Sequence, residues 1–408
     1  MATSDPTPRV PSVGKDPRDR SAVQEPREKT FFRELDEAVI EADRCIQCGT
    51  CVLACPSDSI GIDAVEDRPT LVRMCTGCSR CWDFCPRSGL RYEKLLELED
   101  ADRTGDPQTY AARARDPTVR RFGQDSGTVT ALLAELLDAG ELDGALVARE
   151  SDTEPLKGEA ALVTTREDLI ASAGSYYNQT MQLGHLSELV DQLDVEDPAI
   201  AVVGTPCVIE GAAALERYEW ADEASPIALT IALMCTRNFE WDRLRTRLEG
   251  HGVDPATVDR LDVSDGVLYA FDEDRTVLLD VPVEDFDGAA LYGCAECTDF
   301  VGGAADISAG NVGSPDGYTT VVIRSDRGSS AWELARNGLE MNHLQEASAV
   351  DRLAAWNERR AKQALPRPYD PDGSLTISYG EHRGAYDETA RAPQPLNPAR
   401  VYQYEEWC

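Results

Sequence analysis

The sequence predicts a chain of mixed α+β and α/β class, with a small cysteine-rich module in front of a larger α/β domain. Two observations predict this organisation. One cysteine spacing occurs twice between residues 45 and 85, and from Arg121 to about Leu365 short apolar runs alternate with helical periods. Strand-length and helix-length segments that alternate in this way are typical of α/β domains.

These patterns divide the chain into five segments. Residues 1–30 are rich in proline, aspartate, arginine and serine without an apolar period, which predicts a disordered lead. The cysteine-rich module is predicted over residues 31–95, and the polar stretch 96–120 is interpreted as a linker. The larger domain is predicted over 121–365, and the proline-rich residues 366–408 are interpreted as an irregular tail.

Eight cysteines form two runs with the same spacing, C-x2-C-x2-C-x3-C, and a proline closes each run. This spacing is typical of ferredoxins with two 4Fe-4S clusters, in which the fourth cysteine of each run binds the other cluster. Zinc ribbons and disulfide staples are the alternatives, but zinc sites favour two spaced pairs of ligands. The module is therefore predicted to be ferredoxin-like and to bind two clusters. The predicted ligands are Cys45, Cys48, Cys51 and Cys85 for the first cluster, and Cys75, Cys78, Cys81 and Cys55 for the second.

The first helix of the larger domain is predicted from apolar residues at i, i+3, i+4, i+7 and i+8, namely Val129, Leu132, Leu133, Leu136 and Leu137. Ser126 is the predicted N-cap and Gly140 the predicted stop. The preceding loop, Gly123–Thr128, offers backbone N–H groups at a positive helix end that suits a phosphate. Other capped helices after glycine loops share this pattern, so alone it identifies no ligand.

Four further cysteines predict a third 4Fe-4S site. Pro198–Val203 and Pro226–Met234 are predicted as buried strands, and a cysteine follows the carboxyl end of each. Parallel sheets bind ligands at that edge, and a C-x2-C pair adds two more thiols. The alternative is that single cysteines are small buried apolar residues, but the set of four favours a cluster. The set is Cys207, Cys235, Cys294 and Cys297.

The charge of the chain predicts its environment. Asp and Glu number 74 against 40 Lys and Arg, a formal net charge of −34, and only five of the basic residues are lysine. The acidic residues are spread along the chain, which favours a surface adapted to high salt over a merely acidic mesophilic protein. Nucleic acids and anionic membranes are unsuitable partners for such a surface.

Thirteen cysteines without a signal peptide indicate metal ligation in a reducing cytoplasm. No run of 18 apolar residues is present, so we expect no membrane insertion.

Six motifs, in this order, strongly resemble the beta-subunit family of coenzyme F420-reducing hydrogenase and F420H2 dehydrogenase. They are Arg121–Leu133, Gly174–Tyr177, Val203–Cys207, Met234–Phe239, Cys294–Phe300 and Ala305–Thr320. The resemblance extends from about Phe31 to Arg324, and the last motif is its most specific part. The acidic composition also looks haloarchaeal. The same layout occurs in another member of this family, 7-hydroxymethyl chlorophyll a reductase.

The resemblance implies a flavin, FAD or FMN, beside an iron–sulfur cluster, with coenzyme F420 as hydride partner. The larger domain would then be a flavin-binding catalytic domain. The candidate flavin-binding residues lie in the helix-opening loop and in the family motifs. They are Gly123, Gln124, Asp125, Ser126, Gly127, Thr128, Ser175, Tyr177, Asn178, Gly204, Thr205, Asn238, Gly310, Asn311 and Gly313. No catalytic acid or base is assigned.

Three positions depart from the family pattern. Tyr176 replaces a common lysine, Val208 a common glutamine, and Arg237 a common acidic residue. The lost lysine bears on recognition of a polyanionic coenzyme tail, whose charge Arg237 could meet instead. These departures leave the substrate open.

The implied cofactors predict an oxidoreductase. A reduced deazaflavin passes hydride, clusters accept single electrons, and a flavin exchanges both. We therefore expect hydride exchange between F420 and the flavin, and single-electron transfer to the clusters and then to a partner protein or further subunits. The alternatives are a ferredoxin-dependent flavin reductase of another substrate and an electron-relay subunit of a larger complex.

Overall fold

The structure is a computed structural model, and it describes residues 31–78, 80–87, 106–218, 226–364 and 368–371. The predicted lead, nearly all of the predicted tail, and the end of the predicted module lie outside the described residues.

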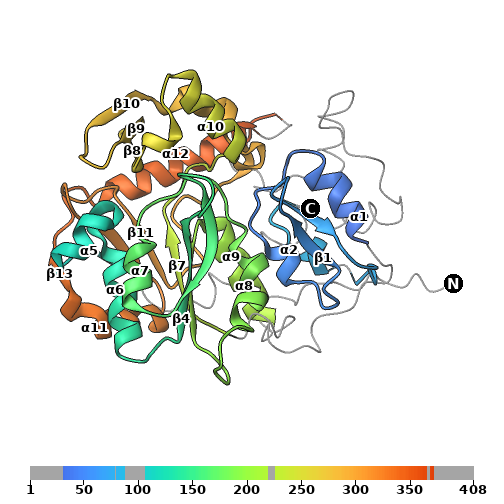
Figure 1. Ribbon diagram of the computed structural model, residues 1–408, viewed down its shortest axis with the longest axis horizontal. Coiled ribbons are helices and arrows are strands. Elements are labelled where there is room, and N and C mark those ends of the chain that lie inside the picture. The colour runs from blue at the N-terminus through green and yellow to red at the C-terminus, as the bar shows by residue number, and fades with distance from the viewer. Residues whose placement is uncertain (1–30, 79, 88–105, 219–225, 365–367, 372–408) are drawn as a thin grey trace.

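A mixed sheet of eight strands forms the centre of the large domain, in the order β13-β3-β12-β11-β7-β6-β4-β5 (Figure 1). Its strands are β3 (Gln108–Ala114), β4 (Gly144–Glu150), β5 (Gly158–Val163), β6 (Ile200–Gly204), β7 (Ile227–Leu233), β11 (Ile307–Gly310), β12 (Thr319–Ile323) and β13 (Leu339–Asn342). The four strands β4, β6, β7 and β11 are parallel, and the others pair antiparallel at the two sides. The parallel centre agrees with the predicted α/β domain, whereas the antiparallel flanks were not predicted.

Both predicted strands are present as β6 and β7, and the packing of β6 shows why that strand is apolar throughout. Ile200 and Val202 pack into a core on one face of the sheet, and Ala201 and Val203 pack into a core on the other. Because side chains alternate along a strand, a strand covered on both faces is apolar at every position.

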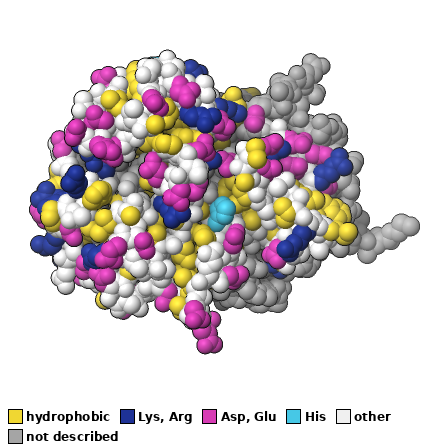
Figure 2. Space-filling view, in the orientation of Figure 1, with side chains coloured by type: hydrophobic (Ala, Val, Ile, Leu, Met, Phe, Trp, Pro, Cys, Tyr) yellow, Lys and Arg dark blue, Asp and Glu magenta, His cyan; other side chains and the backbone are white. Residues whose placement is uncertain are grey.

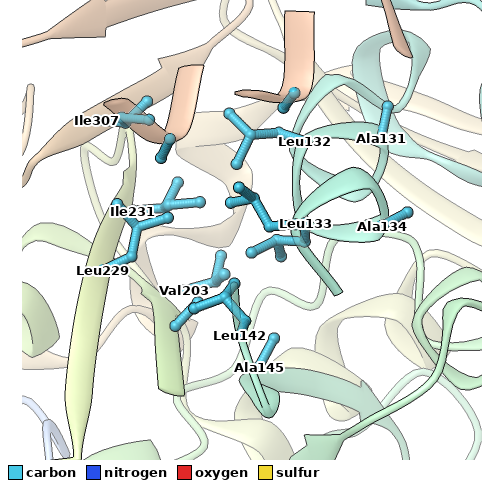
Figure 3. Packing of buried hydrophobic residues seen from close by; sticks show 14 of the residues in the cluster. Ala131, Leu132, Leu133, Ala134, Leu142, Ala145, Val203, Leu229, Ile231 and Ile307 are labelled. Atoms are coloured by element: carbon cyan, nitrogen blue, oxygen red, sulfur yellow. The ribbon is translucent and has the colours of Figure 1, made fainter. Parts of the chain in front are cut away.

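Helices cover both faces of this sheet (Figure 1). They are α5 (Pro117–Phe122), α6 (Thr128–Asp138), α7 (Arg166–Ala171), α8 (Gln182–Val190), α9 (Pro206–Tyr218) and α11 (Asp326–Ala335). A further helix, α12 (Ser348–Ala364), packs against the turn Tyr292–Glu296. Helices α6 and α11 pack together in one core, where Leu132 and Leu133 meet Ile231 and Ile307 of the sheet (Figure 3). Helices α8 and α9 pack in the other core. The predicted apolar face of α6 is confirmed.

The predicted N-cap of α6 is wrong. Gly127, with φ of 71°, is the N-cap, and no side chain caps this helix. Ser126 has a positive φ, and its hydroxyl donates to the carbonyl of Asp125 within the loop. Gly140, with φ of 71°, follows the last turn as predicted.

The prediction of a linker over residues 96–120 is wrong for its second half. Gln108–Ala114 forms β3, which lies between β12 and β13 inside the sheet, and α5 begins at Pro117. Ala112 and Ala114 are buried, while Arg113 bonds to Glu340 of β13. This locally polar segment therefore forms a strand because β12 and β13, from the far end of the chain, pair with it.

The N-terminal module is small and lies against α8 and α9 (Figure 1, blue). Its elements are α1 (Phe32–Leu35), a π-helical turn (Asp36–Ile40), α2 (Thr50–Leu53), β1 (Ile60–Asp63), β2 (Arg68–Leu71) and α3 (Arg80–Asp83). Gly49, with φ of 82°, brings the start of α2 close to α8, since a Cβ there would lie 2.6 Å from the carbonyl oxygen of Met181. The module is therefore packed tightly on the large domain.

A second, three-stranded antiparallel sheet packs with α10 (Trp241–Gly250) in a core of its own. Its strands are β8 (Arg260–Ser264), β9 (Val267–Phe271) and β10 (Val277–Pro282). In the described residues, no helix is both long and apolar enough to cross a membrane.

Removing salt should destabilise the protein. Acidic side chains are scattered over the whole described face in Figure 2, in keeping with the net charge of −34. In molar KCl the Debye length is about 3 Å, so repulsion between carboxylates is screened, whereas at low salt it acts over tens of ångströms. We expect the melting temperature to rise steadily between low and molar KCl. Equal melting temperatures would remove the interpretation of a surface adapted to high salt.

Candidate iron–sulfur centres and flavin site

The first predicted cluster site is a cavity in the N-terminal module. All four predicted thiols line it together with Arg87, and these thiols are Cys45, Cys48, Cys51 and Cys85. Cys85 comes from the second run, as the crossed ligand pattern requires. Backbone N–H groups two residues on donate to the sulfurs of Cys45 and Cys85, each over 3.4 Å. Such donors stabilise thiolate charge, so the residues present fit an iron–sulfur cluster.

The second predicted site lies in the core of the same module. Cys55 and Cys81 are buried in one apolar cluster, and Cys75 packs against it. The sulfur of Cys75 accepts N–H bonds from Phe32 and Gly77, each over 3.4 Å, and the sulfur of Cys55 accepts one from Ser59 over 3.3 Å. Cys78 is half-buried. Three predicted ligands thus share one environment, with donors like those of the first site.

The third predicted site lies at the carboxyl edge of the parallel strands. Cys207 is in the first turn of α9 after β6, Cys235 follows β7, and the C-x2-C pair is in a 3-10 turn (Tyr292–Glu296) and the residue after it. Burial raises the pKa of Cys207 most, and the neighbouring Cys48, Cys297 and Cys294 raise it further. Burial likewise raises the pKa of Cys235, with further increases from both members of the pair. The four predicted thiols are therefore electrostatic neighbours, and Cys207 and Cys294 pack in one core cluster with Cys48 of the module.

Polar groups surround the thiols of the third site. The side-chain amide of Gln179 donates to the sulfur of Cys207 over 3.1 Å, and the hydroxyl of Thr205 lies 3.2 Å from it. Burial raises the pKa of Cys294 to about 11, while a hydrogen bond from the backbone of Asn238 and the charge of Arg87 oppose the increase. Thiols buried in this way lose their protons when they bind metal, so cluster assembly releases protons.

The twelve cysteines in the described part of the chain are free thiols. In the same residues, no three His, Cys, Asp or Glu side chains converge closely enough to hold one metal ion. A cubane makes a different demand, because each thiolate binds a separate iron and the four sulfurs stand further apart than the ligands of one ion.

Three charged residues between the first and third sites were missed by sequence reasoning. Arg44 and Glu296 form an ion pair of 3.0 Å, and each side chain is only 4% exposed. Arg87 donates to the backbone carbonyl of Glu296 over 3.3 Å. Arg44 and Glu296 are each next to a cysteine in the sequence, and Arg87 is two residues from one. This nearness to cysteines is the sequence signal that could have identified them.

The loop before α6 lies at the same edge of the sheet as the third site. The hydroxyl of Thr319, the first residue of β12, donates to the carbonyl of Asp125 over 2.6 Å. The glycines of the loop serve internal packing, since a Cβ on Gly127 would lie 2.6 Å from the carbonyl oxygen of Val119. The hydroxyl of Thr128 is also occupied, because it donates to the carbonyl of Ala112 over 2.8 Å. A bulky residue at Gly127 would thus disturb the loop whether or not a phosphate binds there.

Two carboxylates face this loop. Burial raises the pKa of Asp125 to about 6, Asp262 raises it further, and Arg260 opposes the increase. The side-chain oxygen of Gln124 is buried and has no hydrogen-bond partner. Two arginines also adjoin the loop, because Arg260 donates to the carbonyls of Phe122 and Gly123 and Arg275 to that of Arg121. Phosphate binding at this loop stays a prediction.

Tyr177 lies between this loop and the third site. Burial raises the pKa of its phenol, and Asp262, Asp125 and Cys235 contribute in that order. Its hydroxyl accepts the backbone N–H of Val263 over 3.1 Å. Tyr177 therefore borders both the loop and the thiols.

Some of the other predicted flavin-binding residues make internal hydrogen bonds or packing contacts, and others are half-buried at the edge of the sheet. Asn178 is buried and exchanges hydrogen bonds with the backbone of Gly158, which makes it a framework residue. A Cβ on Gly310 would lie 2.7 Å from the sulfur of Met234, so this glycine allows close packing. Gly204 ends β6 next to Thr205. Ser175, Asn311 and Gly313 are half-buried.

Replacing Asp125 with asparagine should flatten the fall of stability with rising pH. The pKa of Asp125 is raised in the folded state, so its proton stabilises the fold at low pH, and this stability is lost as the pH rises from about 4 to about 6. Between pH 5 and pH 7.5, wild type should lose about 1–2 kcal/mol relative to Asp125→Asn in urea unfolding. Asp152→Asn, at an 88% exposed side chain, is the control and should behave as wild type. Parallel curves for Asp125→Asn and wild type would contradict the raised pKa.

Family models match most of the described chain. Residues 109–187 and 197–347 match the N-terminal and C-terminal models of the coenzyme F420 hydrogenase/dehydrogenase beta subunit, and residues 38–90 match a 4Fe-4S dicluster domain. The chain belongs to the coenzyme F420 hydrogenase/dehydrogenase beta-subunit family. The resemblance deduced from the motifs is confirmed, as is the ferredoxin-like character of the module. The N-terminal family model begins at Thr109, the second residue of β3.

Three family relatives illustrate the extent of the similarity. The coenzyme F420-dependent sulfite reductase of Methanocaldococcus jannaschii is 30% identical over 90% of this chain, which spans only 58% of that protein. The coenzyme F420 hydrogenase subunit beta of Methanothermobacter thermautotrophicus is 30% identical over 64% of this chain and 98% of its own length. A chain of the F420-reducing NiFe hydrogenase complex from Methanosarcina barkeri superposes with a TM-score of 0.58, at 28% identity over 63% of this chain and 89% of that chain.

Proposed function

We propose that the chain is an iron–sulfur flavoprotein oxidoreductase that exchanges hydride between coenzyme F420 and a bound flavin, and single electrons between the flavin and three 4Fe-4S clusters. The observation that carries the proposal is the placement of Cys207, Cys235, Cys294 and Cys297 at the carboxyl edge of the sheet, where Cys207 and Cys294 pack in one cluster with Cys48 of the module. The F420-linked names of several relatives support the choice of coenzyme.

The residues at this edge would hold the flavin between the α6 loop and the third site. A bound flavin would supply the exchange of hydride for single electrons. Tyr177 borders this space, and Gln124 offers a buried side-chain oxygen without a partner to a donor on the ligand. Asp125 offers a carboxyl group that is partly protonated near pH 6. Gln124→Leu is therefore a better test of flavin binding than a change at Gly127.

The positions of the thiols support one order of electron transfer. Cys48 of the first site packs in one core cluster with Cys207 and Cys294 of the third site, and Cys51 of the first site packs in another with Cys55 and Cys81 of the second. The first site therefore lies between the other two. Electrons from the flavin would pass through the third, first and second sites to a partner protein or further subunit.

The departures from the family pattern bear on the substrate. Tyr176 packs against Gly158, where a built Cβ would lie 2.6 Å from its own Cβ, and burial raises the pKa of its phenol to about 12. Arg237 is paired with Asp287, which offsets its charge. Neither residue offers an unpaired cation to a polyanionic tail, and this observation keeps a reductase of another substrate as the second candidate.

Anaerobic mixing with F420H2 tests the proposal. The flavin absorbance should bleach within minutes, followed by loss of cluster absorbance. If F420H2 causes no change while dithionite or a reduced ferredoxin bleaches the flavin, F420 is not the substrate. The control is Gln124→Leu, which should lose flavin and retain the iron of the N-terminal module.

A further inference from the structure

Arg87 is a buried arginine that lies between two of the cysteine sites. Its side chain is 9% exposed, and it lines the cavity that contains the four thiols of the first site. Its Nη1 donates to the carbonyl oxygen of Glu296, which lies between the two cysteines of the C-x2-C pair in the third site. Its Nε is buried and has no hydrogen-bond partner. One guanidinium thus reaches both sites.

The charge of Arg87 is not neutralised by its hydrogen bond to protein. The carboxylate of Glu296 is taken by Arg44, which donates to it from Nε and Nη2 over 3.0–3.3 Å. Arg87 bonds only to the neutral backbone carbonyl of the same residue. Arg44 and Glu296 therefore cancel, while the guanidinium of Arg87 has no hydrogen bond to a carboxylate of the described residues.

We propose that Arg87 is a positioning residue shared by the first and third iron–sulfur sites, whose buried positive charge favours the reduced state of both clusters. The inference rests on the proposed function, because it needs clusters at both sites. A cubane with four thiolate ligands carries net negative charge, and reduction adds one more negative charge. A fixed cation in a low-dielectric interior stabilises the more negative state, and cluster potentials depend on such local charges and hydrogen bonds. By acting on both clusters, Arg87 would keep their potentials matched for transfer between them.

Redox titration of the full-length holoprotein, followed by electron paramagnetic resonance, tests this role. In Arg87→Gln the reduction equilibrium constants of two clusters should fall at least tenfold, where each tenfold is about 59 mV for one electron. The reduction equilibrium constant of the remaining cluster, at the second site, should stay within threefold of wild type. Arg33→Gln is the matched control, since it removes the same charge from the same module at a side chain that is 81% exposed. It should leave all three constants within threefold of wild type.

Arg87→Lys separates charge from shape, because it retains the positive charge and loses the planar guanidinium. In Arg87→Lys we expect the reduction potentials of the clusters at the first and third sites to be closer to those of wild type than to those of Arg87→Gln. Full iron content with unchanged potentials in Arg87→Gln would overturn the inference. If Arg87→Gln fails to assemble clusters, clusters in Arg87→Lys with potentials near wild type would support the role of the positive charge. Failure of both variants to assemble clusters would overturn the inference. A wild-type protein with no cluster at the third site would refute the proposed function itself, before any variant is compared.

Discussion

Replacing Cys294 with serine should lower the iron content of anaerobically purified protein from about twelve atoms per chain to about eight. Cys294 is buried, its pKa is raised by burial, and Cys297 lies beside it, so its loss leaves three thiols for the third cluster. Serine is a poor ligand for a cubane at neutral pH because its hydroxyl stays protonated. Iron and acid-labile sulfide assays measure the change, and the flavin should lose its electron path to the other two clusters.

The control for this change is Cys408→Ser, the same chemical replacement at a cysteine that no predicted site uses. It should retain about twelve irons. Eight irons in wild type, unchanged in Cys294→Ser, would mean that the third site holds no cluster. A loss of all iron in Cys294→Ser would mean that the three sites assemble only together.

Replacing Arg44 with methionine should lower the free energy of unfolding by about 3–5 kcal/mol. Arg44 and Glu296 are each 4% exposed, and they join the N-terminal module to the third site. Removal of one partner leaves a buried charge without compensation, which is far more costly than the pair itself. Urea unfolding of the anaerobic holoprotein, followed by tryptophan fluorescence, measures the loss.

The double variant Arg44→Met/Glu296→Met removes both charges and should recover most of this loss, because an apolar pair of similar volume often replaces a buried ion pair without penalty. Arg33→Met, which removes an arginine whose side chain is exposed in its pair with Glu37, should leave the free energy of unfolding close to that of wild type. If the double variant is as unstable as the single one, packing by the side chains and not their charge holds the module to the domain.

The positions of the cysteines in the fold could be predicted from the sequence because local spacing determines most of their geometry. Three thiols at short intervals need only a loop and a turn of helix to gather, and the crossed fourth ligand is a property of the repeated run. Cys207 and Cys235 were predictable because β6 and β7 are continuous apolar runs, and the ends of parallel strands lie at one edge.

Features that depend on distant partners could not be predicted. Gln108–Ala114 contains polar residues and becomes a strand because β12 and β13 pair with it from more than 200 residues away. The approach of Asp262 to Asp125, which raises the pKa of Asp125, likewise depends on the placement of the second sheet. The only sequence signal for Arg87 and Glu296 is their nearness to cysteines. Their contact with each other arises only when the chain is folded.

The number of electrons that F420H2 delivers to the anaerobic, oxidised protein tests the central claim most directly. The proposed cofactors hold about five electrons, two on the flavin and one on each of three clusters. Titration followed by absorbance and electron paramagnetic resonance should therefore reach its end point near two and a half equivalents of F420H2, with signals from reduced cubanes. An end point at one equivalent, with a bleached flavin and no reduced cubane, or no reaction at all, would contradict an electron path from F420H2 through the flavin to the clusters.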